Sequence, residues 1–386
     1  MFLVKEVGLA LDSRECVILA RPRRGELEEL RYPALAQVRG AEIRSVGQRA
    51  HRLVGKSRDV VTVFPGRVED PIILGDYLQR VVPRRSMLEM RRLWASVPTG
   101  TGLQALHNLR QCFEASLGPT ETILVPELLA AAVGCGFPVL RLEDDSHKAK
   151  MVIHLGVSRM SAGVFVDGSL TGLVVKVGSW DLVTRELQET LQFRLGTALG
   201  HNTLFKVVRC LSRSFFERET SKSSAVKDTP AASHQPSPLA KLDPVAPAEI
   251  APPANLRSFS EQGLIEYVVE DETVTRVIDL QLKTLLFNLE KVVSGSFAKL
   301  RSEGRGEIAS DLFSDRVMLC GDVFFDPASL SQYFTRVSRF RFESTNGHAV
   351  AKGLRKIMES DRAHKQAYRE LSKTIHDESR FLTCTI

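Results

Sequence analysis

The sequence predicts an α/β fold built from two related domains, each carrying a smaller inserted lobe. Strand-type and helix-type segments alternate along the chain, which is typical of α/β proteins. A β-hairpin pattern at residues 1–20 recurs at residues 151–166, and this recurrence indicates an internal duplication. The chain has 386 residues, of which 43% are hydrophobic, so it is long enough to form more than one core.

We expect a first domain at residues 1–145, with a basic lobe at about 25–71, and a second domain at residues 146–386. The second domain would carry a peripheral lobe at about 182–275. Apolar residues at helical spacing predict helices at 72–82, 103–117, 127–133, 181–195 and 273–300, and a helical segment from residue 349 onward.

Residues 219–255 hold seven of the 17 prolines and no aromatic residue. Such a segment buries too little apolar surface to order itself, so we predict a disordered insertion, either a passive loop or a partner-binding tether. Residues 359–386 predict a charged helical tail, either solvated or used for docking.

Six segments carry recognisable motifs in a fixed order: VGLALDSRECVILA at 7–20, RSVGQRAHRLVGKSRDVVTVFP at 44–65, GRVED at 66–70, VPTG through ILVPELLAAAVGCGFPV at 97–139, VMLCG at 317–321 and TNGHAVAKGL at 345–354. Together they resemble the MreB/Mbl family of bacterial actins. The resemblance implies a duplicated actin/Hsp70 (ribonuclease H-like) fold. It also implies a cytoskeletal protein of the cytoplasmic membrane face.

The same resemblance implies that the ATP-handling residues of that family are replaced here. Its two loop aspartates fall on Ala10 and His154, its water-activating glutamate falls on Ala105, and its GGD turn includes Trp180. Without these groups we expect no catalytic residue, no metal ligand and little or no ATP hydrolysis. Some residues of the family's phosphate and adenosine loops remain. They are either remnants of a nucleotide site or turn residues that the fold itself needs. These residues are Ser13, Gly156, Ser158, Ser161, Gly178 and Gly321.

Residues 81–95, VVPRRSMLEMRRLWA, interleave apolar and basic side chains. We expect them to contact anionic lipid, since basic side chains attract anionic headgroups and Trp favours the interface. The alternative is an amphipathic core helix whose arginines face water. The expected membrane contacts are Met87, Leu88, Leu93, Trp94, Arg84, Arg85, Arg91 and Arg92.

Composition narrows the functional classes further. The net charge of +6 comes without a zinc-finger or RNA-recognition signature, so we expect no nucleic-acid partner. No run of about 18 apolar residues is present, and six scattered cysteines without a CxxC pair predict free thiols. A signal peptide is not predicted at the N-terminus, and we expect a cytoplasmic protein peripheral to the inner membrane.

Three functional hypotheses follow. The first is a non-hydrolysing actin homologue that assembles with itself or with another bacterial actin, with cell-shape or elongation membrane proteins as further partners. The second is an atypical ATP- and Mg²⁺-binding filament protein in which Asp12, Gln104 or Asp322 replaces lost groups. The third is a scaffold that kept the fold as a binding platform and does not polymerise.

Overall fold

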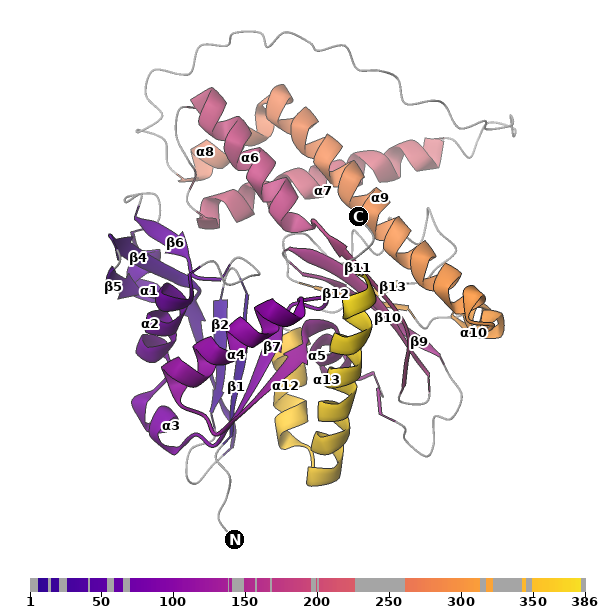
Figure 1. The fold of residues 1–386 in the computed structure, drawn as a ribbon. Coiled ribbons are helices and arrows are strands. Elements are labelled where there is room, and N and C mark those ends of the chain that lie inside the picture. Colours follow the sequence, from indigo (N-terminus) through magenta and orange to yellow (C-terminus); the bar gives the residue numbers. More distant parts are fainter. Residues whose placement is uncertain are drawn as a thin grey trace.

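The structure is a computed structural model that describes residues 6–12, 15–20, 26–40, 42–53, 59–64, 70–137, 139–140, 149–156, 158–166, 169–195, 199, 201–225, 261–312, 317–321, 342–344 and 349–382. Two five-stranded sheets form its centre, and helices pack around them (Figure 1). Among these residues, no helix is long and apolar enough to cross a membrane.

The first sheet has the order β3-β2-β1-β7-β8. Its strands are β1 (Glu6–Leu11), β2 (Glu15–Ala20), β3 (Glu28–Pro33), β7 (Arg92–Val97) and β8 (Glu121–Pro126). β1, β2 and β3 pair antiparallel, whereas β7 and β8 continue the sheet in parallel from β1. The predicted N-terminal hairpin is therefore present.

The second sheet repeats this arrangement, with the order β11-β10-β9-β12-β13. Its strands are β9 (Lys150–Leu155), β10 (Arg159–Val166), β11 (Ser169–Val177), β12 (Val317–Gly321) and β13 (Phe342–Ser344). β9, β10 and β11 pair antiparallel, and β12 and β13 follow in parallel. The same order and strand directions in both sheets confirm the duplication that the hairpin patterns predicted.

A small third sheet, β5-β4-β6, lies beside the first. It consists of β4 (Leu35–Arg39), β5 (Glu42–Val46) and β6 (Val60–Thr62), with the short helix α1 (Gln48–His51) packed against β4 and β5. The chain then enters α2 (Pro71–Val81), where Asp70 Oδ1 accepts hydrogen bonds from the backbone N–H groups of Ile72 and Ile73. Asp70 is therefore the N-cap that fixes the start of α2.

Further helices cover the first sheet: α3 (Arg84–Glu89), α4 (Leu103–Leu117) and α5 (Glu127–Gly134). The helix α4 has the predicted bounds and ends at Gly118, whose φ of 67° suits the glycine C-cap. On the second half, α6 (Trp180–Leu195), α7 (His201–Ala225), α8 (Glu261–Glu270) and α9 (Glu272–Ser302) form a helical lobe above the second sheet, and α10 (Gly306–Asp311) follows α9 (Figure 1).

The helix α9 packs one face on β10 and β11. Its N-cap, Asp271, also pairs with Arg194 of α6 at 2.7 Å, and both side chains are largely buried. Leu280 is 54% exposed, so it does not belong to the buried face. The helix α7 runs to Ala225, which means that the predicted disorder of 219–255 is wrong for its first seven residues; residues 226–255 lie outside the described chain.

The C-terminal helices are α12 (Ala349–Glu359) and α13 (Arg362–Leu382). They follow the second sheet in sequence, yet α12 packs on α5, β1 and β7 of the first half, and α13 contacts both β8 and β11. Leu371 and Ile375 of α13 are buried, so a fully solvated tail is wrong. The domain boundary at residues 145/146 stays a prediction.

The crossing of α5 and α12 is a backbone contact. A Cβ at Gly353 would overlap the carbonyl oxygen of Ala130, and a Cβ at Gly134 would overlap that of Ala349. We therefore expect Gly353→Ala to force the helices apart and to cost about 1–3 kcal/mol of folding free energy. Thermal unfolding followed by circular dichroism measures this loss.

Gly295→Ala is the matched control, since Gly295 is also helical and its Cβ would find its nearest neighbour, in Val174, at 3.7 Å. Ala is favoured over Gly in a helix interior by about 0.8–1.0 kcal/mol, so this variant should melt at the same or a higher temperature. Equal melting temperatures for Gly353→Ala and the wild type would show that the crossing is looser than described.

Candidate functional site

The candidate site lies where the tight turns of the two hairpins approach the N-terminus of α5. In the first turn, Asp12 Oδ1 accepts the backbone N–H of Glu15 at 2.8 Å, and the Asp12 N–H donates to the Glu15 carbonyl at 3.0 Å. Asp12 thus closes the β1–β2 turn. One oxygen of Asp12, proposed in the second hypothesis to replace a lost group, thus has a structural role in the turn.

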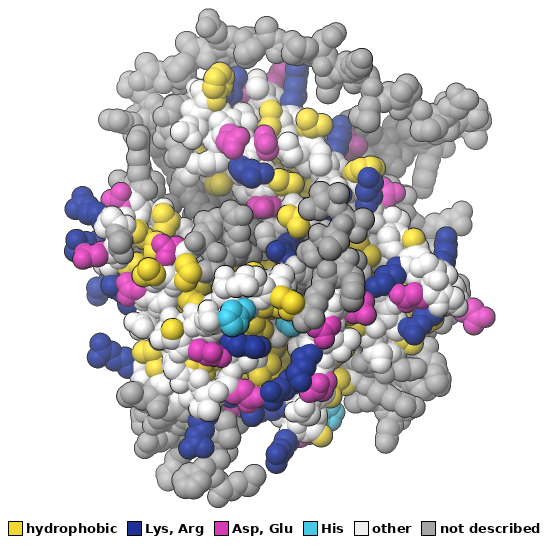
Figure 2. All heavy atoms as spheres, in the orientation of Figure 1, with side chains coloured by type: hydrophobic (Ala, Val, Ile, Leu, Met, Phe, Trp, Pro, Cys, Tyr) yellow, Lys and Arg dark blue, Asp and Glu magenta, His cyan; other side chains and the backbone are white. Residues whose placement is uncertain are grey.

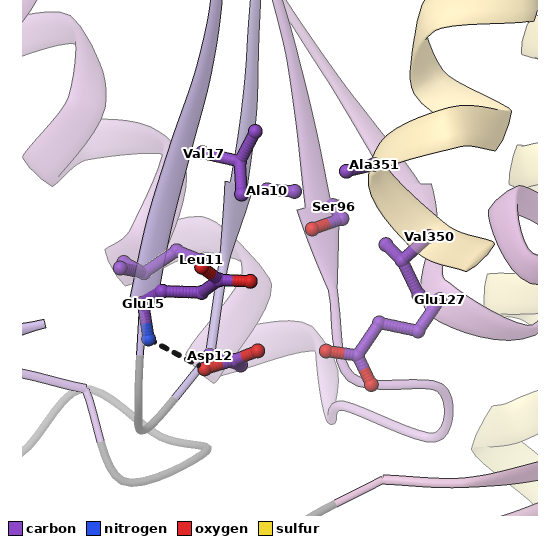
Figure 3. Close-up of a pocket in the computed structure, with 9 residues that line it drawn as sticks. All are labelled: Ala10, Leu11, Asp12, Glu15, Val17, Ser96, Glu127, Val350 and Ala351. Carbon is purple, nitrogen blue, oxygen red and sulfur yellow. Dashed lines mark hydrogen bonds between the residues drawn. The ribbon is translucent and has the colours of Figure 1, made fainter. Parts of the chain in front are cut away.

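A cavity of about 20 Å³ lies beside this turn, lined by β1, β2, β7 and the first turns of α5 and α12. Figure 3 shows the carboxylates of Asp12, Glu15 and Glu127 around this space. A cavity of this volume holds about one water molecule. Three carboxylates also make it unfavourable for a phosphate without an intervening cation.

Glu127 connects the two turns and was missed by the sequence reasoning. On one side it lines the cavity with Asp12, and on the other its Oε2 lies 3.8 Å from Nδ1 of His154 at the end of β9. Its place in the first turn of α5 favours a negative charge. Its position directly after a buried strand was the available signal, because the first helical turn after a strand often bears site residues.

Burial lowers the pKa of His154 to about 4. The ring is therefore neutral at pH 7, and its approach to Glu127 is not an ion pair. The side chain is 2% exposed and contributes no charge to a bound ligand. An imidazole at this position cannot replace the aspartate expected from the family resemblance.

Arg159, at the start of β10, supplies the cation of the site. Its Nη1–H donates to the Thr99 carbonyl at 3.4 Å, which links the second hairpin to the segment after β7. Burial lowers the pKa of the Arg159 guanidinium, and the charge of Glu127 offsets part of that shift. Thr99 Oγ1 in turn accepts the Leu128 N–H at 3.0 Å and so satisfies a donor of the first turn of α5.

Two of the retained glycines use their N–H groups within the protein. The Gly156 N–H donates to the Arg159 carbonyl and the Gly178 N–H donates to the Ser158 carbonyl, both at 2.9 Å. Gly178 has a φ of 87°, which suits glycine, and a Cβ at Gly321 would overlap the carbonyl oxygen of Leu155. Each of these three glycines therefore has a role in the fold that does not involve a nucleotide.

The remaining predicted positions are dispersed. Ser161 on β10 and Ala10 on β1 are both buried. Ser158 is half-buried beside the second turn. Ser13 lies outside the described residues. Ala105 is exposed on α4, as is Gln104, whose Nε2 donates to Asn108 Oδ1 at 3.0 Å. Trp180 is fully buried in the core of the second half. No group of three or more His, Cys, Asp or Glu side chains within the described ranges could hold a metal ion.

The described residues of the two turns do not fit a phosphate well. Carboxylates line the cavity beside the first turn, and the N–H groups of Gly156 and Gly178 bond to protein carbonyls. Arg159 at the start of β10 and Glu127 at the start of α5 carry opposite charges. Both lie near the hairpin turns, where the family resemblance implies the phosphate loops.

The membrane contacts predicted at residues 81–95 need correction. Leu93 and Trp94 lie in the middle of β7 and are 0% and 1% exposed, so they belong to the sheet and cannot insert into lipid. Arg92 pairs with Glu6 at 2.8 Å and with Glu121 at 2.6 Å. Met87 packs on the core of the first half.

Only Arg84 and Arg91 of that set are exposed, and the side chains of Arg85 and Leu88 lie outside the described atoms. The predicted apolar insertion is therefore wrong for its two main residues. Contact of Arg84 and Arg91 with a membrane surface stays a prediction.

Comparison with known proteins gives the fold. No family model and no curated protein matches the sequence. Solved structures do match. MreB5 of Spiroplasma citri bound to AMPPNP is similar over 95% of this chain and 99% of its own, with a TM-score of 0.63 and 13% identity. The MamK double helical filament is similar over 93% of this chain and 100% of its own, with a TM-score of 0.58 and 12% identity. The chain thus has the two-domain fold of the bacterial actins MreB5 and MamK, as its motifs predicted.

Proposed function

We propose that this chain is an actin-like cytoskeletal protein that assembles into filaments, with itself or with another bacterial actin, and hydrolyses little or no ATP. One observation carries the proposal: the fold is kept over nearly the whole chain, while three carboxylates line the cavity beside the first phosphate turn. A similar protein, MamK, is known as a double helical filament.

Internal contacts in this chain can take over the bridging role of a bound ligand. Arg159 of the second half bonds to Thr99 of the first, and Glu127 lies between the two hairpin turns. These contacts join the halves without a nucleotide. A subunit of fixed shape loses less entropy on assembly than one that must first be ordered by a ligand.

We also propose that the filament lies on the cytoplasmic face of a membrane, near membrane proteins of cell shape or elongation. The net charge of +6 and the exposed Arg84 and Arg91 support attraction to anionic lipid. Such attraction is weak for one subunit, but a filament multiplies it through avidity.

Assembly should not depend on nucleotide. We expect the purified chain to form filaments in the absence of ATP, alone or mixed with a bacterial actin partner, since its own contacts hold the two halves. High-speed pelleting and negative-stain electron microscopy, with and without Mg-ATP, measure this. Filaments that form only with Mg-ATP would favour the atypical ATPase, and the absence of polymer in every mixture would favour the scaffold.

Hydrolysis should stay at background. We expect release of radiolabelled γ-phosphate by the wild type to equal that of a buffer blank, because the positions of the loop aspartates and the glutamate hold Ala10, His154 and Ala105. Gln104→Ala is the matched control. Gln104 bonds to Asn108 on an exposed helix face, so this change should alter nothing. Clear wild-type turnover that is lost in Gln104→Ala would contradict the proposal.

A further inference from the structure

A groove of about 540 Å³ lies between α4 and α13, over the edge strand β8. One wall is apolar and includes Leu103, which is 49% exposed, and Leu106. Figure 2 shows Lys, Arg and His side chains over this part of the molecule, mixed with apolar and acidic ones. Three Lys or Arg side chains line the groove against one carboxylate, so its lining carries a surplus of positive charge: Arg110, Arg369, Lys373 and Asp377.

Two of these cations are available to a partner. Arg110 is exposed on α4 and has no ion pair within the described part of the chain. Lys373 of α13 pairs with Glu370 at 3.0 Å, but both side chains are more than half exposed, so the pair is weak. Arg369 is already paired with a glutamate of β8, and Asp377 has contacts of its own. The groove therefore offers Arg110 and Lys373 next to its apolar wall.

A side chain of complementary character lies on the other half of the fold. Phe193, in the last turn of α6, is 82% exposed, more than any other large hydrophobic side chain in the described ranges. A single exposed apolar side chain is not unusual on a monomer, so its surroundings decide what it indicates. Aromatic residues are enriched at protein–protein interfaces, which makes Phe193 a candidate anchor.

Acidic side chains lie near Phe193. Arg194, the next residue, pairs with Asp271 at 2.7 Å, so the end of α6 lies beside the junction of α8 and α9. The residues on either side of Asp271 are exposed glutamates, and a third exposed glutamate stands one helical turn before Phe193. These three carboxylates are Glu189, Glu270 and Glu272.

Two of these carboxylates are available to a partner. Glu272 pairs with Arg276 at 3.2 Å, but both side chains are exposed, so the pair is weak. Glu189 and Glu270 have no ion pair in the ranges that the structure describes. Phe193 is therefore an apolar side chain beside a surplus of negative charge.

The two surfaces complement each other in polarity and in charge. A groove with an apolar wall and two available cations fits an exposed ring with two available carboxylates. Phe193 belongs to the helical lobe above the second sheet, whereas α4 lies on the first half (Figure 1). A contact between two different patches of identical molecules is heterologous, and each added copy leaves one groove and one ring free for the next. Repetition of such a contact builds a chain of subunits, which is why a second copy is the partner that fits.

We propose that Phe193 of one copy enters the α4–α13 groove of the next copy, with its ring against Leu103. The flanking carboxylates, those of Glu189 and Glu270, then face the two available cations of the groove. All of these groups are exposed, so neither surface has to open. This inference rests on the proposed assembly of the chain with itself, and it names the contact that such assembly uses.

Charge reversal on either surface tests the contact in the full chain. Arg110→Glu with Lys373→Glu makes the groove acidic, and Glu189→Lys with Glu270→Lys makes the Phe193 surface basic. Each double variant alone sets like charges against each other, so we expect its critical concentration for assembly to rise roughly tenfold or more.

An equimolar mixture of the two double variants should assemble as the wild type does. In an alternating chain of the two variants, every contact again joins opposite charges. Sedimentation velocity at low salt measures the polymer, negative-stain electron microscopy shows its form, and circular dichroism checks that each variant is folded.

The matched control, Arg209→Glu with Lys283→Glu, reverses the same number of charges at exposed positions on α7 and α9 and should assemble as the wild type does. Equal loss in this control would overturn the proposal, because assembly would then follow net charge alone.

The outcomes separate this contact from the proposed function. If both double variants polymerise as the wild type does, the contact is refuted while assembly stands. If the mixture fails as each variant alone does, the two surfaces do not meet and the contact is refuted as well. A wild type that stays monomeric refutes self-assembly together with this contact, and mixtures with another bacterial actin then test the proposed function.

Phe193→Ser removes the ring without a change in charge, and we expect it to raise the critical concentration roughly tenfold. Phe287→Ser is the matched control, since Phe287 on α9 is also an exposed ring, at 54%, and its loss should leave assembly unchanged. Unchanged assembly of Phe193→Ser would overturn the proposal. Equal loss in both variants would do so too, because assembly would then follow exposed apolar surface in general.

Discussion

The close crossing of α5 and α12 joins the two halves of the fold. The helix α12 follows the second sheet in sequence, yet it packs on α5, β1 and β7 of the first half. Gly134 and Gly353 let the two backbones touch, and Lys356 Nζ donates to the Val133 and Gly134 carbonyls at the end of α5. A lysine at this position adds a hydrogen bond to carbonyls at the end of the helix and complements the helix dipole. The two halves are therefore joined at the base of the cleft.

This junction also sets the geometry of the cleft. The helix α5 begins with Glu127, and α12 begins beside the same cavity with Val350 and Ala351. Asp12, Glu15 and Glu127 line the cavity near the starts of the two helices. Glu15 pairs with Arg31 at 3.2 Å, and the charge of Glu127 acts on the pKa of the partly buried Arg159. Acidic and basic side chains of the chain itself thus meet at the two hairpin turns.

The sequence predicts much of the fold because the relevant patterns are local. The hairpins at β1–β2 and β9–β10 follow from strand-type runs, and the helices α4 and α5 follow from helical spacing of apolar residues. Motif order then predicts the two-domain fold, and solved structures confirm it. Local patterns do not reveal which half of the fold a helix packs against. The sequence therefore left open whether the C-terminal helix is solvated or docked, and the burial of Leu371 and Ile375 shows that it is docked.

The errors at the candidate sites have physical reasons as well. Leu93 and Trp94 stand beside arginines, which favoured an amphipathic membrane segment, but a parallel strand in the middle of a sheet is buried on both faces and shows no alternation. Arg92 at the start of that strand is neutralised by Glu6 and Glu121, which are distant in sequence. Glu127 was missed although it follows a buried strand, because the side chains near it, His154 of β9 and Arg159 of β10, are distant in sequence.

We propose that this chain keeps the actin fold while its own side chains occupy the place of the nucleotide phosphates. Calorimetric titration with Mg-ATP and, separately, with Mg-ADP tests this proposal, because binding needs neither turnover nor assembly. We expect no saturable heat with either nucleotide up to millimolar concentration, at protein concentrations where the fold is intact by circular dichroism. Stoichiometric binding at micromolar concentration would contradict it, since a triphosphate would then have to sit beside the carboxylates of Asp12, Glu15 and Glu127.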